Sequence, residues 1–286
     1  ATQRRPPNHR VTVACRYAET VDFDADRRVL RAGVVDSTNE RALCAVADGT
    51  ARHGDWFLAT GQQAGRGRRG AAWRSAEGEG FYGSLVLLPE PGGDLRPPAL
   101  TMAAGLGVVG VARMLGLAEA RLKWPNDLLL GPAKLAGILV EARTFDPARP
   151  HFVVGIGLNV GQQSFPPELL AERPVTSLAL AGIETEVEDV FAILAPTVEK
   201  WIKLALDPAA PARAQLEAAY LRATGLDGLR VRVQAGQESV SGHLTGLALE
   251  GGLALRLENG STRWVPLEHV AQVEPVKGPD GEHSTR

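Results

Sequence analysis

The 286-residue chain has only two cysteines, almost no net charge and no long uninterrupted apolar stretch, and each shortage excludes a class of protein. Cys15 and Cys44 are too few for a disulfide framework or a zinc site, so we expect a reducing, cytoplasmic setting. The 31 basic residues nearly balance the 33 acidic ones, which argues against a general nucleic-acid-binding protein but allows a local basic site. Gly, Pro or Arg interrupts the longest apolar tracts, and no apolar segment follows the basic N-terminus, so neither a membrane span nor a secretory signal is expected.

A hydrophobic content of 44% is enough for a substantial core, and the length suits one large domain with a small one. Apolar runs bounded by turn residues predict strands near residues 34–35, 56–60, 82–88 and 152–160, with a weaker one at 11–17. Periodicity, length or cap residues predict helices at 38–48, 98–118, 186–206 and 211–223. From about residue 229, short strands divided by Gly and Asn-Gly turns indicate a separable all-β module.

The arginine loop, G-Q-Q-A-G-R-G-R-R-G-A-A-W at residues 61–73, holds three arginines, four glycines and no acid. Its G-x-G-x-x-G pattern matches a dinucleotide-binding fingerprint, but the residues that follow are too glycine-rich and too few for the required helix. The same pattern at residues 105–110 lies inside a predicted helix, where close helix packing explains it better. Neighbouring arginines repel each other unless acids or an anion neutralise them, and guanidinium groups match phosphate oxygens. The loop therefore predicts an anion site, with a solvated turn as the alternative.

Residues 121–142 carry two lysines on apolar segments that Gly131-Pro132 separates. A hairpin is expected there, with Lys123 and Lys134 on its two arms. Neither Ser nor Thr follows Lys134, so the segment is not a phosphate-binding P-loop. Lysines on hairpins are commonly solvated, but beside an arginine loop these two predict an anion pocket.

Two polar motifs complete the pattern. D-S-T-N-E at residues 36–40 follows a predicted strand, so its Ser, Thr or Asn can cap the next helix, bind a polar ligand head, or do both. G-I-G-L-N-V at residues 155–160 places glycines inside a strand, which marks the close approach of a ligand or another backbone segment. Asn159 offers both a donor and an acceptor to a base edge.

Four motifs occur in this order: S-T-N, G-Q-Q-A-G-R-G-R-R-G-x-x-W, K-W-P-N-D-L…K-L-A-G-I-L-V-E and G-I-G-L-N-V. Together they resemble the biotin protein ligases, also called biotin–acetyl-CoA-carboxylase ligases, and the resemblance covers residues 36 to about 275. The resemblance implies an α+β fold in which a mixed β-sheet carries helices on one face, as in class II synthetases, followed by a small SH3-like β-barrel. The expected organisation is an N-terminal arm (1–30), a catalytic biotin- and ATP-binding domain (31–224), the SH3-like domain (225–276) and a flexible tail (277–286). Residues 1–36 show no helix–turn–helix pattern, so we expect a short form without the DNA-binding domain of the repressor relatives.

The resemblance also implies two half-reactions. Biotin and Mg-ATP first give biotinyl-5′-AMP and pyrophosphate, and a lysine of a biotin carboxyl carrier protein then attacks the adenylate and releases AMP. No dedicated metal site is implied, but Mg²⁺ would enter with ATP and lie near Asp127. The expected partners are biotin, ATP and the carrier protein, with no nucleic acid or membrane, and the chain would be a monomer or a homodimer.

Residue by residue, the resemblance gives Lys134 and Arg68 catalytic roles, with Lys134 bridging the biotin carboxylate and the α-phosphate and Trp73 flanking the adenine. The implied biotin-binding residues are Ser37, Thr38, Asn39, Gln62, Gly65, Arg66, Gly67, Arg68, Lys134 and Gly137. The implied nucleotide-binding residues are Arg66, Arg68, Trp73, Lys123, Asn126, Asp127, Lys134 and Asn159.

The sequence departs from the family in one place, and it leaves two alternative functions open. Ala71-Ala72 stands where many relatives carry an arginine or lysine, so the loop carries less positive charge and is expected to retain the adenylate less well. The first alternative is a lipoate–protein ligase, which shares the adenylate chemistry, although the K-W-P-N-D and G-R-G-R-R-G motifs favour biotin. The second is a biotin-sensing DNA-binding regulator.

Overall fold

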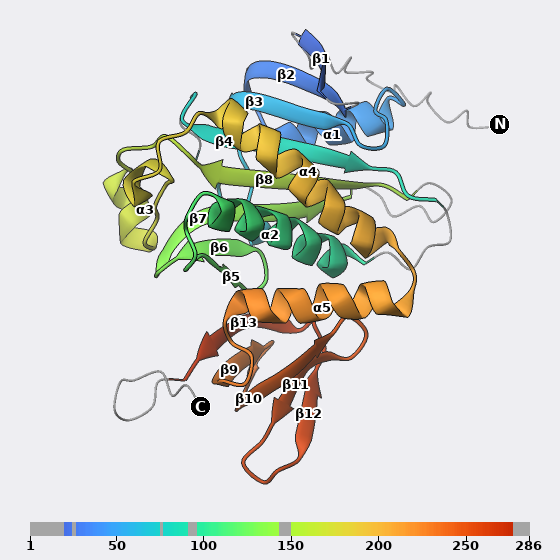
Figure 1. Ribbon diagram of the computed structural model, residues 1–286, viewed down its shortest axis with the longest axis vertical. Helices are drawn as coiled ribbons and strands as arrows, with labels where there is room; N and C mark the ends of the chain where they lie inside the picture. The colour runs from blue at the N-terminus through green and yellow to red at the C-terminus, as the bar shows by residue number, and fades with distance from the viewer. Residues whose placement is uncertain (1–19, 25–26, 75–76, 91–95, 143–149, 277–286) are drawn as a thin grey trace, which may run out of the picture.

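The computed structural model describes residues 20–24, 27–74, 77–90, 96–142 and 150–276 (Figure 1). The strand expected at residues 11–17, most of the expected arm and the expected tail therefore lie outside the described residues. Among the described residues the chain forms two β-sheets and five α-helices, with helix α5 lying between the sheets (Figure 1). This confirms a mixed α+β fold.

The larger sheet has eight strands in the order β1-β2-β3-β4-β8-β7-β6-β5. Only β2 and β3 run parallel, and every other neighbouring pair is antiparallel, so the sheet is mixed. The parallel pair needs a crossover, which helix α1 (Thr38–Ala47) supplies. The strands are β1 (Thr20–Asp24), β2 (Arg27–Val35), β3 (Trp56–Gln62), β4 (Gly80–Leu87), β5 (Arg121–Lys123), β6 (Asp127–Leu130), β7 (Ala133–Glu141) and β8 (Phe152–Asn159).

Helices cover both faces of this sheet, which corrects the expectation of helices on one face. Trp56 and Leu58 of β3 point into the apolar core beneath α2 (Pro97–Met114) and α4 (Val187–Leu206). Phe57, between them in sequence, points to the opposite face and packs with Leu43 of α1. Side chains alternate across a strand, so a strand that is buried throughout, such as β4, needs cover on both faces.

The predicted helices are confirmed with small shifts at their ends, and the G-x-G-x-x-G pattern of residues 105–110 does lie in a packed helix. A methyl group at Gly107 would lie 2.6 Å from Val198 Cγ2 and 2.8 Å from Val198 Cα on α4. At Gly110 the nearest atom would be Thr197 Cγ2 at 3.4 Å. Gly107 therefore permits close approach of the two helices, whereas Gly110 has room for a methyl group.

These two glycines provide a matched test of the packing. We expect Gly107→Ala to lower the free energy of unfolding by about 1–3 kcal/mol, because the added carbon meets the backbone of α4. Gly110→Ala is expected to raise it by up to about 1 kcal/mol, because alanine is the better helix former. Urea unfolding of both variants measures the difference, and equal effects at the two positions would contradict this account.

By length and composition alone, α2 is also the one helix among the described residues that is apolar enough to cross a membrane. Within the fold, 67% of that segment is buried against the sheet and against α4 and α5. Its apolar character is thus accounted for by its place in the core.

The boundary expected for the N-terminal arm at residue 30 is corrected by strands β1 and β2, which pair antiparallel from residue 20 onward. The stretch includes two adjacent arginines, Arg27 and Arg28. In the structure Arg27 Nε donates to Glu199 Oε1 of α4 at 2.7 Å, and Arg28 forms an ion pair with the buried Asp55. Because these acids neutralise the arginines, a charged stretch can lie in the sheet.

The smaller sheet follows α5 (Ala210–Thr224) and has the order β12-β11-β10-β9-β13. Its strands are β9 (Arg230–Ala235), β10 (Glu238–Ala248), β11 (Gly252–Arg256), β12 (Thr262–Val265) and β13 (Val270–Pro275), and the sequence analysis missed β13. Among the described strands β12 and β13 are the two edges and do not pair, so the sheet is open. The sheet is less separable than expected, because its buried residues share one continuous core with the larger sheet and Trp124 Nε1 donates to Val270 O at 3.1 Å.

Candidate functional site

The polar motif and the arginine loop meet at one edge of the larger sheet. Strands β2 and β3 are parallel, so the residues that follow them, 36–39 and 63–73, leave the sheet at the same end. Backbone hydrogen bonds join the two segments there: Gln63 N donates to Val35 O, and Ala64 N to Asp36 O, each at 2.8 Å. Two motifs that are separate in sequence therefore border one site.

The side chains of the S-T-N motif are buried and turn toward the sheet. Ser37 is the N-cap residue of α1 but makes no side-chain cap hydrogen bond. Gln62 Oε1 accepts from the Thr38 N–H at 2.9 Å, and Asn39 Nδ2 donates to Leu139 O at 3.2 Å. The ligand-binding interpretation of the motif is therefore compatible with the structure, whereas a side-chain capping role is not seen.

Two polar residues that the sequence analysis did not assign belong to this cluster. Ser84, fully buried on β4, has its Oγ 2.6 Å from Asn39 Oδ1 and 2.8 Å from Thr38 Oγ1. Glu141, the last residue of β7, accepts from Asn39 Nδ2 at 2.7 Å. A serine in the otherwise apolar strand G-F-Y-G-S-L-V-L was the available signal for the first, because a buried hydroxyl needs a partner.

The arginine loop folds back on itself as a small hairpin. Trp73 N donates to Gly65 O at 2.8 Å, and Gly67 N donates to Ala71 O at 2.6 Å. A methyl group at Gly65 would lie 2.5 Å from Trp73 O, so only glycine allows the two arms to come this close. At the tip, Arg69 has φ 55°, a left-handed conformation that is uncommon for arginine.

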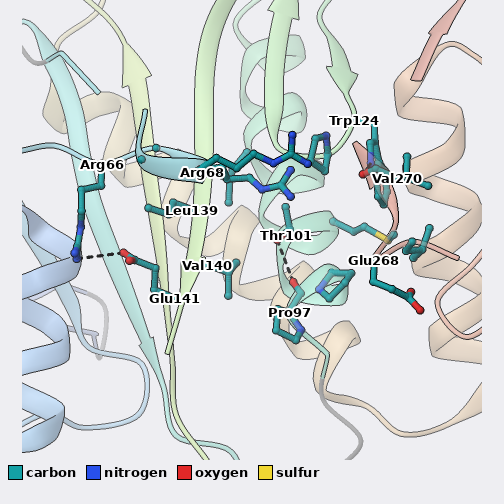
Figure 2. A pocket seen from close by; sticks show the side chains of 18 residues that line it. Arg66, Arg68, Pro97, Thr101, Trp124, Leu139, Val140, Glu141, Glu268 and Val270 are labelled. Atoms are coloured by element: carbon teal, nitrogen blue, oxygen red, sulfur yellow. Dashed lines mark hydrogen bonds and ion pairs between the residues drawn. The ribbon is translucent and has the colours of Figure 1, made fainter. Parts of the chain in front are cut away.

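The arginines of the loop point in different directions (Figure 2). Arg66 reaches toward Glu141 and lies 3.0 Å from Glu40 Oε2, so acids already neutralise it. Arg68 points the other way, toward Trp124, along a cavity of about 470 Å³ that Arg69 also lines. Burial lowers the pKa of Arg68, and the neighbouring Arg69 lowers it further. An anion bound in the cavity would stabilise the charged form of Arg68.

Lys134 is a buried lysine beside the loop. Its Nζ lies 2.6 Å from Asp127 Oδ1 and 5.3 Å from the centre of the Trp73 ring. Burial lowers the pKa of Lys134, and the ion pair with Asp127 partly opposes this effect. Lys123 does not share a hairpin with Lys134 as expected: it lies on the separate short strand β5, which pairs with β6, and only β6 and β7 form the hairpin around Gly131.

Trp73 fills the space between the polar cluster and Lys134. Methyl groups at Gly137 and Gly157 would lie 3.0 Å and 2.5 Å from its ring, so these glycines make room for the indole. The cleft that remains has a volume of only about 40 Å³, far below the roughly 300–1,000 Å³ usual for small-molecule sites. A larger ligand therefore enters this cleft only if Trp73 moves. Trp73 Nε1 is buried with no hydrogen-bond partner, so the indole loses no hydrogen bond when it moves.

Most of the implied site residues thus fall into three groups. One group borders the small cleft: Ser37, Thr38, Asn39, Gln62, Arg66, Gly67, Trp73, Asn126 and Gly137. Arg68 lines the larger cavity, where it is joined by Arg66 and Gly67, and Lys134 and Asp127 form the ion pair beside the cleft. Lys123 and Asn159 line neither cavity, and Asn159 Nδ2 donates to Thr176 O at 2.8 Å. Trp73 lies with the residues that the resemblance assigns to biotin, although the resemblance places Trp73 itself beside the adenine.

Among the described residues, no group of three or more His, Cys, Asp or Glu side chains could hold a metal ion. The arrangement instead joins a buried hydrogen-bonding cluster to a cationic wall. Such a site suits a ligand with a neutral polar head and an anionic end.

Comparisons with known proteins agree with this chemistry. The sequence model of the biotin/lipoate A/B protein ligase family matches residues 32–159. The bifunctional ligase/repressor BirA of Escherichia coli is 35% identical over 189 residues, which are 60% of this chain and 57% of that protein. The biotin–[acetyl-CoA-carboxylase] ligase of Paracoccus denitrificans is 40% identical over 173 residues, 58% of this chain and 69% of that ligase. The chain belongs to the biotin protein ligase family.

Membership in the biotin protein ligase family extends to the fold. The biotin protein ligase of Aquifex aeolicus, solved in complex with biotin and ATP, has a TM-score of 0.69 and 25% sequence identity to the chain. The comparison covers 87% of this chain and 99% of the Aquifex protein. Against the first curated relatives, all bifunctional ligase/repressors, the match spans only 46–57% of their length.

Proposed function

We propose that the chain is an ATP-dependent biotin–protein ligase, which converts biotin and ATP to biotinyl-5′-AMP and transfers biotin to a lysine of a carboxyl carrier protein. The observation that carries the proposal is the position of the arginine loop, whose Arg66 and Gly67 border both the small cleft and a cavity of about 470 Å³, with Lys134 against the Trp73 ring of the same loop. That volume lies within the usual range for small-molecule sites. The Paracoccus relative bears the name of this activity, and the Aquifex structure contains both substrates.

In the first half-reaction a biotin carboxylate oxygen attacks the α-phosphorus of ATP, and the bond to pyrophosphate breaks. Two anions must approach each other, and negative charge grows on the phosphoryl oxygens and the leaving group. Lys134, buried and fixed by Asp127, is placed to offset this charge without being consumed. Arg68, which lines the larger cavity, would supply a second cation.

In the second half-reaction the amine of a carrier lysine attacks the acyl carbon, and AMP leaves. The mixed anhydride would hydrolyse if water reached it, so the loop of residues 61–73 acts as its cover. Trp73 would move from its place over Gly137 and Gly157 and then pack on the bound ligand. The residues assigned to biotin and to the nucleotide by the family resemblance are proposed on the same basis.

Magnesium is proposed to enter with ATP, whose phosphates would hold most of its coordination sphere. The ion would neutralise phosphate charge. Asp127 is the protein carboxylate that we propose near it, and its present ion pair with Lys134 shows that it can hold a cation.

We further propose that the larger sheet with its helices, up to residue 224, forms the catalytic domain and that residues 225–276 form an SH3-like domain. We also propose that the protein works in the cytoplasm as a monomer or homodimer, and that its macromolecular partner is a carrier protein. The turn at Gly225, between α5 and β9, supports the boundary. The antiparallel five-stranded sheet supports the SH3-like assignment.

ATP–pyrophosphate exchange with the purified chain tests the function. We expect isotope from pyrophosphate to enter ATP when biotin is added, and much less exchange when lipoate replaces biotin. Exchange that depends only on lipoate would replace this proposal with a lipoate–protein ligase. Tight, sequence-specific binding of the chain to its own upstream DNA in a gel shift would show that regulation of transcription had been missed.

A further inference from the structure

Glu141 connects the polar cluster to the arginine loop through a single carboxylate oxygen. Its Oε2 accepts from Asn39 Nδ2 at 2.7 Å and lies 3.5 Å from Arg66 Nη2. Figure 2 shows Arg66 and Glu141 facing each other across the gap between the loop and β7. The small cleft lies on the Asn39 side of Glu141, while Glu141 itself lines the larger cavity. One side chain therefore touches both parts of the site.

Arg66 is held by a second acid. Its Nη2 lies 3.0 Å from Glu40 Oε2, and Glu40 stands in the first turn of α1. One acid from α1 and one from β7 therefore contact the same guanidinium on the loop. The side chains of Arg66, Glu40 and Glu141 are 43%, 29% and 26% exposed, so each ion pair is partly screened by water and modest in strength.

Asn39 has little freedom apart from this contact. Its amide packs directly on Gly155, where any side chain would overlap it, and its Oδ1 lies 2.6 Å from Ser84 Oγ. A carboxylate and a backbone carbonyl accept hydrogen bonds, so Glu141 and the Leu139 carbonyl together make the NH₂ group of Asn39 face β7 and its oxygen face Ser84. The orientation of the amide decides which ligand groups it can bind.

We propose that Glu141 is a positioning residue of the ligase: it fixes the Asn39 side chain at the border of the cleft and, together with Glu40, holds Arg66 so that the arginine loop stays closed beside the cleft. The part of this inference that concerns biotin rests on the proposed function. The contact between Glu141 and the loop does not depend on that function. Orientation of the ligand and retention of the adenylate would then depend on one carboxylate.

Three substitutions separate the two contacts. Glu141→Gln keeps an oxygen that can accept from Asn39 but removes the charge that attracts Arg66. Glu40→Gln weakens only the hold on Arg66, and Glu141→Ala removes both contacts of Glu141. Glu258→Gln is the matched control, because Glu258 is an exposed acid that pairs with Arg230 in the C-terminal sheet, away from the site.

The first measurement is trypsin cleavage in the loop without any ligand, with the cut sites at Arg66, Arg68 and Arg69 identified by mass spectrometry. Cleavage follows the population of the open loop when opening is fast. We expect Glu141→Gln and Glu40→Gln each to be cut about two- to fivefold faster than the unchanged chain and the control. Equal cleavage rates in all four proteins would contradict the proposal that Glu141 and Glu40 keep the loop closed.

The second measurement is the KM for biotin in pyrophosphate exchange, together with biotin labelling of a bystander protein. We expect Glu141→Ala to raise the KM about tenfold and Glu141→Gln to raise it less than about threefold, because only the first loses the acceptor. Both glutamine variants should increase bystander labelling. An unchanged KM in Glu141→Ala would overturn the positioning role. Failure of the unchanged chain to exchange at all would instead refute the proposed function, while the trypsin result would still decide the contact with the loop.

Discussion

Lys134→Ala is expected to slow adenylate formation about 10²–10³-fold, the loss typical when one preorganised donor to a developing charge is removed. Lys134 is buried, its pKa is lowered chiefly by that burial, and Asp127 fixes its Nζ at 2.6 Å. A cation already stripped of water needs no reorganisation when charge develops on the phosphate. Its contribution should therefore be larger in the transition state than in the bound ground state.

Rapid-quench measurement of biotinyl-AMP formation, beside equilibrium binding of ATP, checks this prediction. The binding constant for ATP should change by less than about tenfold, and equal losses in binding and rate would indicate a ground-state role. Lys203→Ala, at an exposed position on α4, is the control and should leave both quantities unchanged. Because Lys134→Ala also leaves Asp127 without its partner, thermal unfolding of the variant must accompany the kinetics.

Arg68→Gly is expected to release biotinyl-AMP from the site while adenylate formation stays within about tenfold of the unchanged chain. Arg68 lines the larger cavity on the loop, and partial burial together with the neighbouring Arg69 lowers the pKa of its guanidinium. A charge-assisted contact of this kind contributes about 1.5–3 kcal/mol, so its loss would speed escape about ten- to hundredfold.

Biotin labelling of lysines on a bystander protein, followed by mass spectrometry, reports the escape. Arg52→Gly removes a charge from an exposed loop outside the cleft and should not raise labelling. Normal adenylate formation without increased labelling in Arg68→Gly would refute the role of Arg68 as a clamp. The same assay on Ala71→Arg tests whether the alanines of the loop tip weaken retention: labelling should then fall.

Several features of the fold were predictable because their signals are local. The strand before residue 36, the helix from Thr38 and its end before Gly49 follow from an apolar run, a cap cluster and a glycine with φ 70°. The all-β texture after residue 229 came from turn spacing, yet β13 was missed because its V-A-Q-V-E-P sequence lacks a turn signal of that kind. The strands at the N-terminal edge were wrongly assigned to an arm. Their arginines can lie in the sheet because acids that are distant in sequence neutralise them, and no local pattern indicates those acids.

For the site, the sequence by itself determined the residue types and their order: a polar triad, an arginine loop, a lysine and a glycine-rich strand. Their family resemblance was enough to indicate a biotin ligase before any geometry was known. Only the tertiary structure decided which groups meet: that Arg66 faces Glu40 and Glu141, that Ser84 completes the polar cluster, and that Trp73 lies over Gly137 and Gly157. Such contacts join residues up to about a hundred positions apart, and they depend on strand register and close packing, which no local pattern encodes.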